Sequence, residues 1–242
     1  MGKQSRYLLG RFSILFIILL SSVVLLFVSC GGGGGGSSSS TSSESTTTTY
    51  KLFNSEYFTA GSQETYNLTG SGTGGSYTGT LTLTTQAATT FDGAAAIPVD
   101  GEITFTSTTS VRSYTFKGIE YFNTDTSALT YLGFENDTFN DTTVSSKSVE
   151  VIPQTASIGD SATEGIYTFS SGNIEIVTWK LTQASGGNAN LNIVQTITDS
   201  TGSTTLYTQN YTFVIDKDGN RQSVTLELSE GGVSVTLSGD KT

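Results

Sequence analysis

Histidine is absent from this chain of 242 residues, and cysteine occurs once, as Cys30. Without an imidazole there can be no Ser-His-Asp triad, no Cys-His pair, no histidine-bound zinc or haem and no imidazole base. A single cysteine cannot form an intramolecular disulfide bond, so stability must come from a hydrophobic core. These absences exclude most of the common catalytic arrangements, and we expect neither an enzyme activity nor a cofactor.

Basic residues are also scarce, with 11 Lys and Arg against 21 Asp and Glu and a formal net charge of −10. Lys3, Arg6 and Arg11 precede the first acid, so the chain from Cys30 onward carries 8 basic and 21 acidic residues, a net charge of −13. Nucleic-acid binding requires clustered Lys and Arg. A phosphate-cradling loop requires a Gly-rich run followed by Lys and Ser or Thr, which this sequence lacks. We therefore expect no nucleic-acid partner.

An apolar segment follows the basic start: Phe12 to Val28 carries no charge and is interrupted only by Ser13, Ser21 and Ser22. A basic start, an apolar centre and a small residue at the end are typical of a secretory signal peptide. The alternative is an uncleaved membrane anchor, because 17 uncharged residues reach the lower end of the spanning length of ~17–25 residues. Under either interpretation the rest of the chain lies outside the inner membrane, and an uncleaved anchor would also attach it to the bilayer.

The end of this segment, Leu26-Phe27-Val28-Ser29-Cys30, resembles the lipobox of bacterial lipoproteins. Val28 and Ser29 match the pattern, whereas Phe27 stands where the family prefers leucine. The resemblance implies that residues 1–29 are a signal peptide and that Cys30 becomes the lipid-modified first residue, which leaves no free thiol. The family carries three acyl chains on this cysteine, and two or more chains anchor stably at ~0.8 kcal/mol per buried methylene. It also implies that the protein is located in the cell envelope, at the outer membrane, and that the bilayer is its partner.

The next segment, Gly31 to Thr49, has six glycines followed by Ser and Thr, with Glu44 as its one charge. It has no apolar residue to bury, and we predict a flexible tether over residues 30–49, beginning at the lipidated cysteine. Residues 50–242 are numerous enough for one sizeable domain, which buries roughly 70% of its unfolded surface.

Composition predicts that this domain is all-β. Threonine occurs 42 times and alanine 11 times, and the branched threonine side chain suits a pleated surface better than a helix. Leu81 and Leu83 alternate with threonines, as expected of a half-buried strand. No stretch repeats apolar residues at helical spacing for three turns. We predict an antiparallel sandwich or (half-)barrel of roughly ten to twelve short strands after the tether.

The clearest strand pairing is a hairpin of residues 224–228 and 233–237, each with apolar residues on one face. A second strand covers residues 206–215, and its members Tyr207, Gln209, Tyr211, Phe213 and Ile215 share a face. We predict turns at 70–75, which is rich in glycine, and at 216–220.

Asp216, Asp218 and Asn220 place oxygen ligands at alternate positions, as a calcium loop does at its start. However, the sixth position holds Arg221 instead of glycine, and the twelfth, Glu227, lies on a predicted strand. Asp, Gly and Asn are also favoured in hairpin turns for backbone reasons. We predict a turn without a metal, with calcium at these three residues as the alternative. We interpret the acidic segment 135–141 as a solvated loop, again with calcium as the alternative.

Paired carboxylates are the catalytic arrangement that composition leaves open, because glycoside hydrolysis requires two acids roughly 5–10 Å apart. The candidates are Glu102, Glu120, Glu135, Glu150, Glu164, Glu175 and Glu227. No pattern in the sequence indicates that any two of these acids lie close together. Glu227 is at a solvent-facing position of a predicted strand in which apolar and polar residues alternate. We therefore assign no catalytic residue.

Aromatic residues gather just after the tether, at Tyr50, Phe53, Tyr57 and Phe58. We interpret them as the core side of the first strand, with a carbohydrate-stacking platform as the alternative. The single tryptophan, Trp179, shares a face with apolar neighbours, and we expect it in the core.

These observations predict a membrane-anchored envelope lipoprotein that acts as a non-enzymatic binding, adhesive or structural module, with a glycan, a lipid or an envelope protein as ligand. The first alternative is a carrier or assembly lipoprotein for lipid or outer-membrane components with an apolar concave sheet. The second is a carbohydrate-active enzyme with two carboxylates. An enclosed apolar cavity favours the carrier, a cleft with two facing acids favours the enzyme, and a filled core favours the module.

Overall fold

The computed structural model describes residues 48–109, 112–136 and 141–242. Within these ranges, helical structure is limited to two 3₁₀ turns, η2 (Thr126–Ala128) and η3 (Ser185–Gly187), and the remaining regular structure is β-strand. The all-β prediction is confirmed. None of the described segments forms a helix with the length and apolarity needed to cross a membrane. The predicted signal peptide, Cys30 and all but the last two residues of the predicted tether lie outside the described residues.

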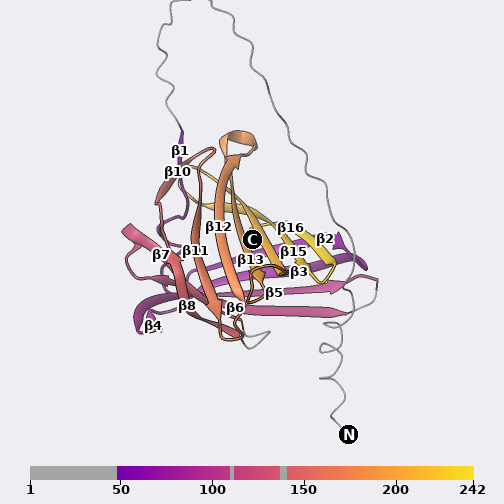
Figure 1. The fold of residues 1–242 in the computed structure, drawn as a ribbon. Coiled ribbons are helices and arrows are strands. Elements are labelled where there is room, and N and C mark those ends of the chain that lie inside the picture. Colours follow the sequence, from indigo (N-terminus) through magenta and orange to yellow (C-terminus); the bar gives the residue numbers. More distant parts are fainter. Residues whose placement is uncertain (1–47, 110–111, 137–140) are drawn as a thin grey trace, which may run out of the picture. The chain divides into compact units, whose positions relative to one another are not determined.

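The strands follow one another through the described part of the chain, and apart from the longer segment between β1 and β2 most of the described connections are short (Figure 1). In chain order they are β1 (Thr49–Lys51), β2 (Gln63–Gly72), β3 (Gly75–Thr85), β4 (Thr89–Phe91), β5 (Ala94–Ser107), β6 (Ser113–Asn123), β7 (Leu129–Asn136), β8 (Asp141–Val149), β9 (Val151–Ile152), β10 (Thr155–Ser157), β11 (Ser161–Phe169), β12 (Ile174–Gln183), β13 (Ala189–Thr198), β14 (Thr205–Ile215), β15 (Arg221–Glu230) and β16 (Val233–Asp240).

Twelve of these strands form one nearly closed, antiparallel, barrel-like sheet. Around the sheet the order is β5, β6, β7, β8, β11, β12, β13, β14, β15, β16, β2 and β3. The pairing of β3 with β5, from Tyr77↔Ser107 to Thr85↔Val99, brings the two ends of this order together. Among the described neighbouring strands of the barrel, the least extensive pairings are β7 with β8, over two residue pairs, and β16 with β2, over four. The barrel alternative of the sequence prediction is therefore confirmed.

The hydrophobic core lies on the inner face of the barrel because apolar and polar residues alternate along each strand. Leu226 of β15 faces Leu237 of β16, and both are fully buried, which confirms the predicted hairpin. Leu81 of β3 is fully buried, and Trp179 of β12 is 5% exposed, as expected from the sequence. Burial of one such side chain contributes ~1.5–3 kcal/mol, and Thr48–Thr242 forms a single compact unit with a core of its own.

The glycine-rich segment 70–75 is mostly strand, so the prediction of a turn over its whole length is wrong. β2 continues to Gly72 and β3 begins at Gly75, which leaves Thr73 and Gly74 as the turn. The physical reason is close packing of backbones: a Cβ atom at Gly70 would lie 1.9 Å from the carbonyl oxygen of Thr236 on β16. Glycine is needed there because no side chain fits between the two strands.

The segment between β1 and β2 fills one end of the barrel, which we call the plugged end. The backbone carbonyl of Tyr57 accepts a hydrogen bond from Oγ1 of Thr85, where β3 ends. The ring of Phe58 contacts that of Phe122 of β6 with 5.2 Å between centroids. Arg221, the first residue of β15, lies over the ring of Tyr57. The opposite end carries the hairpin turns 73–74, 170–173, 199–204 and 231–232.

Candidate ligand-binding site

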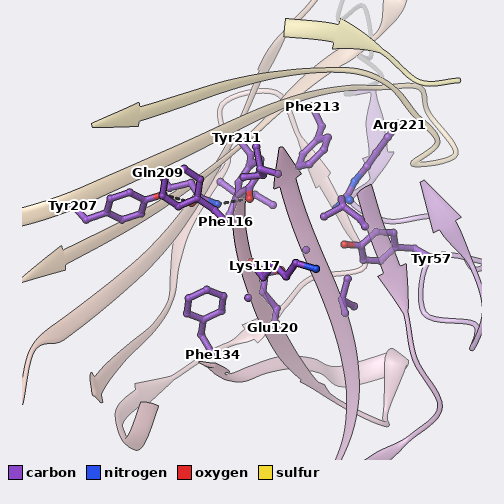
Figure 2. Close-up of a pocket in the computed structure, with 16 residues that line it drawn as sticks. Tyr57, Phe116, Lys117, Glu120, Phe134, Tyr207, Gln209, Tyr211, Phe213 and Arg221 are labelled. Atoms are coloured by element: carbon purple, nitrogen blue, oxygen red, sulfur yellow. Dashed lines mark hydrogen bonds between the residues drawn. The ribbon is translucent and has the colours of Figure 1, made fainter. Parts of the chain in front are cut away.

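A partly open cavity of about 60 Å³ lies inside the barrel, between β14 and the wall formed by β5, β6 and β7 (Figure 2). We call it the barrel pocket. It is lined from Tyr207, near the end opposite the plug, to Tyr57 and Arg221 at the plugged end. At ~10–15 Å³ for each water-sized position, it has room for about five such positions.

One wall of the barrel pocket is the inner face of β14. Tyr207, Gln209 and Tyr211 alternate along it, as the sequence predicts, and Phe213 continues the row toward the plugged end. The Tyr207 hydroxyl donates a hydrogen bond to Oε1 of Gln209, and Nε2 of Gln209 donates one to the Tyr211 hydroxyl (Figure 2). These three side chains are only partly buried, so the pocket exposes both ring surface and polar atoms on this wall.

The opposite wall consists of Phe116 and Glu120 of β6, Phe134 of β7 and two glycines. Gly101 of β5 and Gly118 of β6 face each other across the strand pair. A Cβ atom at Gly118 would lie 2.4 Å from the ring of Phe134, so glycine there admits that ring. At Gly101 the nearest atoms would lie 3.7 and 3.8 Å away. A side chain at Gly101 would therefore extend into the barrel pocket without a backbone clash.

Glu120 supplies a carboxylate to this wall. Its Oε1 atom accepts a hydrogen bond of 2.9 Å from Nε2 of Gln195 on β13. Burial raises the pKa of Glu120, and the charge of Arg221 and the hydrogen bond from Gln195 counteract this rise only in part. A carboxylate has about four acceptor positions, so Glu120 offers acceptor capacity to a ligand in the pocket.

Arg221 forms the floor of the barrel pocket at the plugged end. Its guanidinium carbon lies 4.1 Å from the ring centre of Tyr57 and 4.0 Å from that of Phe213. Its Nη1 atom is 3.3 Å from Oε2 of Glu64, whose other oxygen is 2.7 Å from Nζ of Lys241. Burial raises the pKa of Glu64, but Arg221 and Lys241 outweigh it and hold that pKa below its usual value. Arg221 thus contacts a carboxylate and three aromatic rings, the third being that of Phe53 at 5.4 Å.

A second cavity, of about 20 Å³, shares Glu120 with the barrel pocket and is also lined by Tyr131, Glu164 and Gln195. It has room for about one water molecule. Its lining brings two carboxylates together, Glu120 from β6 and Glu164 from β11, which are far apart in the sequence.

Glu175 of β12 lies close to this second cavity, and the charges of Glu120 and Glu164 act on it. Burial raises the pKa of Glu164 and that of Glu175 to about 8, and neighbouring acids add to the rise. Among the described residues, neither oxygen of Glu175 has a hydrogen-bond partner, and the hydroxyl of Tyr131 has none. Buried polar groups of this kind are rare, and an unplaced water or ligand is a common explanation.

The structure thus gathers three of the seven candidate carboxylates inside the barrel and places others outside. Glu102 is 2.8 Å from Nζ of Lys117 in an exposed ion pair. Glu135 accepts a hydrogen bond from the hydroxyl of Tyr121, Glu150 is exposed, and Glu227 is exposed on β15, as predicted. Sequence reasoning missed the inner set, although one signal was present: Glu175 alternates in phase with buried Val177 and Trp179.

The calcium alternative, Asp216, Asp218 and Asn220, falls in the turn between β14 and β15. Oδ1 of Asp216 accepts hydrogen bonds from the backbone N–H groups of Asp218 and Asn220, and its Oδ2 accepts one from Nδ2 of Asn220. The turn therefore uses the Asp216 oxygens itself. Within the described ranges, no group of three or more acids is placed to hold a metal ion. The prediction of a solvated loop over 135–141 is wrong at both ends, because β7 runs to Asn136 and β8 begins at Asp141, and these strands pair with each other. Residues 137–140 lie outside the described residues.

Of the aromatic residues after the tether, Phe53, Tyr57 and Phe58 lie in the segment that fills the plugged end, and Tyr50 lies on β1. Tyr50 and Tyr57 are buried, and Phe53 and Phe58 pack against the core. Their core position agrees with the prediction, but only Tyr50 lies on a strand, because the chain turns away from β1 after Lys51. Phe53 and Tyr57 stack with 5.5 Å between ring centres, so these rings are used in packing and do not form an open platform.

Comparison of the chain with models of known protein families, with curated protein sequences and with solved structures gives no match. The function proposed below therefore rests on the barrel pocket and on the N-terminal sequence.

Proposed function

We propose that this protein is a bacterial envelope lipoprotein, anchored to the outer membrane through Cys30, whose barrel-like domain binds a small amphipathic ligand without catalysis. The observation that supports this most strongly is the barrel pocket itself. Ligand sites are typically concave, mostly apolar and furnished with a few polar groups that fix orientation. Phe116, Phe134 and Tyr207 supply apolar surface, and Glu120 and Gln209 supply the polar groups.

The partly exposed rings explain why a ligand would gain free energy there. Tyr207 and Tyr211 are on the inner face of β14 and yet remain accessible. Removing apolar surface from water contributes roughly 25 cal/mol per Å², so a ligand that covers these rings is favoured over the water that otherwise contacts them. Its polar group would be oriented by the deeper Glu120.

Cavity size favours a small ligand over the two alternatives. The barrel pocket has room for about five water-sized positions, which is short for the acyl chain of a membrane lipid and therefore does not favour a lipid carrier. The second cavity holds Glu120 and Glu164 but only about one water. A sugar ring cannot lie between these two acids there, so this pair gives no support to a glycoside hydrolase.

The lipid anchor is tested by replacing Cys30 with alanine. We expect the variant to incorporate no lipid, because the thiol is the acylation site that the lipobox resemblance implies. The measurement is metabolic labelling of the full chain with a palmitate analogue in a bacterial host, with wild type as the positive control. A Cys30→Ala chain that still incorporates the label would rule out lipidation at this residue.

Ligand binding is tested by filling the barrel pocket with Gly101→Leu. The sample is the mature chain, residues 30–242 with serine at position 30, titrated with the neutral probe butan-1-ol, whose five non-hydrogen atoms match the size of the pocket, and followed by amide chemical shifts. We expect shifts concentrated on β6 and β14 and a dissociation constant of ~1–5 mM, reasonable for roughly 0.7 kcal/mol per non-hydrogen atom. In Gly101→Leu the response should disappear, because the new side chain occupies the pocket.

The matched control is Thr104→Leu, which adds a similar side chain on the other face of β5, where Thr104 makes an exposed hydrogen bond with Thr115. We expect this variant to respond as wild type does. Equal responses in all three proteins, or shifts that avoid β6 and β14, would contradict the assignment of the pocket.

A further inference from the structure

Acidic groups outnumber basic groups inside the barrel. Among the described residues, Glu120 lines both cavities, Glu164 lines the second, and Glu64 and Glu175 are buried in the interior. The cations that face them are Arg221 and Lys241, both of which contact Glu64. Lys117 also lines the barrel pocket, but its Nζ atom is 2.8 Å from Glu102 in an exposed pair. The interior therefore contains two more carboxyl groups than cationic groups.

Glu175 provides an independent observation that a group is missing from this interior. It is 1% exposed, and neither of its oxygens has a hydrogen-bond partner among the described residues. The hydroxyl of Tyr131, which Glu175 influences electrostatically, also has no partner. A buried carboxyl group without partners is costly, so a donor that enters this region would be stabilised.

We propose that the ligand of the barrel pocket is a small organic cation, a protonated amine or guanidinium on an apolar body, with its charged nitrogen at Glu120 and its body between Phe116 and Tyr211. This inference rests on the proposed function, since it names the ligand class of the same pocket. The charged end points toward the second cavity, where the carboxyl group of Glu164 lies beyond Glu120, with Glu175 close to it. Both acids are mostly protonated at neutral pH, since their pKa is about 8, so they supply acceptor oxygens to the cation and not charge.

Two further features fit a cation better than an anion or a neutral molecule. The barrel already holds one guanidinium on aromatic faces, that of Arg221 on Tyr57 and Phe213, and aromatic faces attract cations through their negative quadrupole. The chain from Cys30 onward has a net charge of −13. A field of that sign raises the local concentration of cations and lowers that of anions.

The test uses three small probes with a four-carbon skeleton and different heads: butylamine, butan-1-ol and butyrate. Each is titrated calorimetrically at neutral pH and low salt into the mature chain, residues 30–242 with serine at position 30. We expect the amine to bind at least ten times more tightly than the alcohol, and the carboxylate more weakly than the alcohol. In Glu120→Gln the amine should lose its advantage, because the amide keeps the shape and the bond from Gln195 but not the charge.

The control variant is Glu227→Gln, which removes the same charge from the exposed face of β15 and should leave the amine preference intact. Thermal unfolding of both variants checks that they fold. Equal binding of the three probes, blocked by Gly101→Leu, would overturn the cation inference and leave the proposed function in place. An amine preference that persists in Glu120→Gln would overturn the role of Glu120. No binding by any probe would overturn both proposals.

Discussion

Replacing Arg221 with methionine is expected to lower the free energy of unfolding by ~3–5 kcal/mol, because it removes one partner of a buried ion pair. The side chains of Arg221 and Glu64 are 3% and 5% exposed, and 3.3 Å separates Nη1 from Oε2. Methionine keeps apolar volume at the site, so the loss reports mainly on the charge. At ~2–4 °C for each kcal/mol in a domain of this size, the unfolding midpoint should fall by about 10 °C.

The comparison variants separate a buried ion pair from an exposed one. Lys51→Ala removes a pair with Asp218 in which 3.7 Å separates the charged atoms and both side chains are more than half exposed. It should change stability by less than ~1 kcal/mol. Arg221→Met combined with Glu64→Gln should recover part of the loss, because no uncompensated carboxylate then stays buried. An Arg221→Met midpoint within 2 °C of wild type would show that this pair does not hold the plugged end together.

Raising the pH from 5 to 9 is expected to destabilise the domain by several kcal/mol, or about 10 °C in the unfolding midpoint. The pKa of Glu164 and that of Glu175 are about 8 in the folded protein, against 4.5 for an ordinary glutamate. The stability that this difference provides is fully present below pH 4.5. As the pH rises, the unfolded chain loses these protons first, so stability falls until about pH 8, where the folded protein loses them as well.

The groups around these two acids are Glu120, Tyr131 and Tyr167, with raised pKa values because they are buried. Glu64 acts in the opposite direction: its lowered pKa contributes stability above the unfolded value of 4.5 that is lost as the pH falls. Glu164→Gln combined with Glu175→Gln should remove most of the alkaline slope in midpoints measured from pH 5 to 9. Glu227→Gln is the control and should keep the slope. An unchanged slope in the double variant would contradict the burial of these acids as ionisable groups.

Local sequence patterns predicted the strands and their inner faces but not the site. The hairpin of β15 and β16 and the inner row Tyr207, Gln209 and Tyr211 follow from period-two alternation, which depends on neighbours along the chain. The meeting of Glu120 with Gln195 and Glu164 depends on which strands become opposite walls of a barrel. No local pattern encodes that pairing, because it is set by closure of the whole sheet.

Two specific misses have the same origin. Gly70 was assigned to a turn because glycine is common in turns, whereas the structure uses it where β16 approaches β2. Phe53, Tyr57 and Phe58 were expected on a first strand, whereas they fill the end of a barrel. In both cases the sequence correctly indicated the requirement at the position, a glycine without a side chain or a buried ring. The residue that creates this requirement lies more than 60 residues away in the sequence.

The claim that the barrel pocket is a ligand site is tested most directly by intermolecular nuclear Overhauser effects between butylamine and the mature chain. We expect contacts from the terminal methyl protons to the rings of Phe116 and Tyr211, and from the methylene next to nitrogen to the side chain of Glu120. These contacts should vanish in Gly101→Leu. Contacts confined to exposed apolar residues such as Val151 or Val233, or contacts that persist in Gly101→Leu, would contradict the pocket as the site.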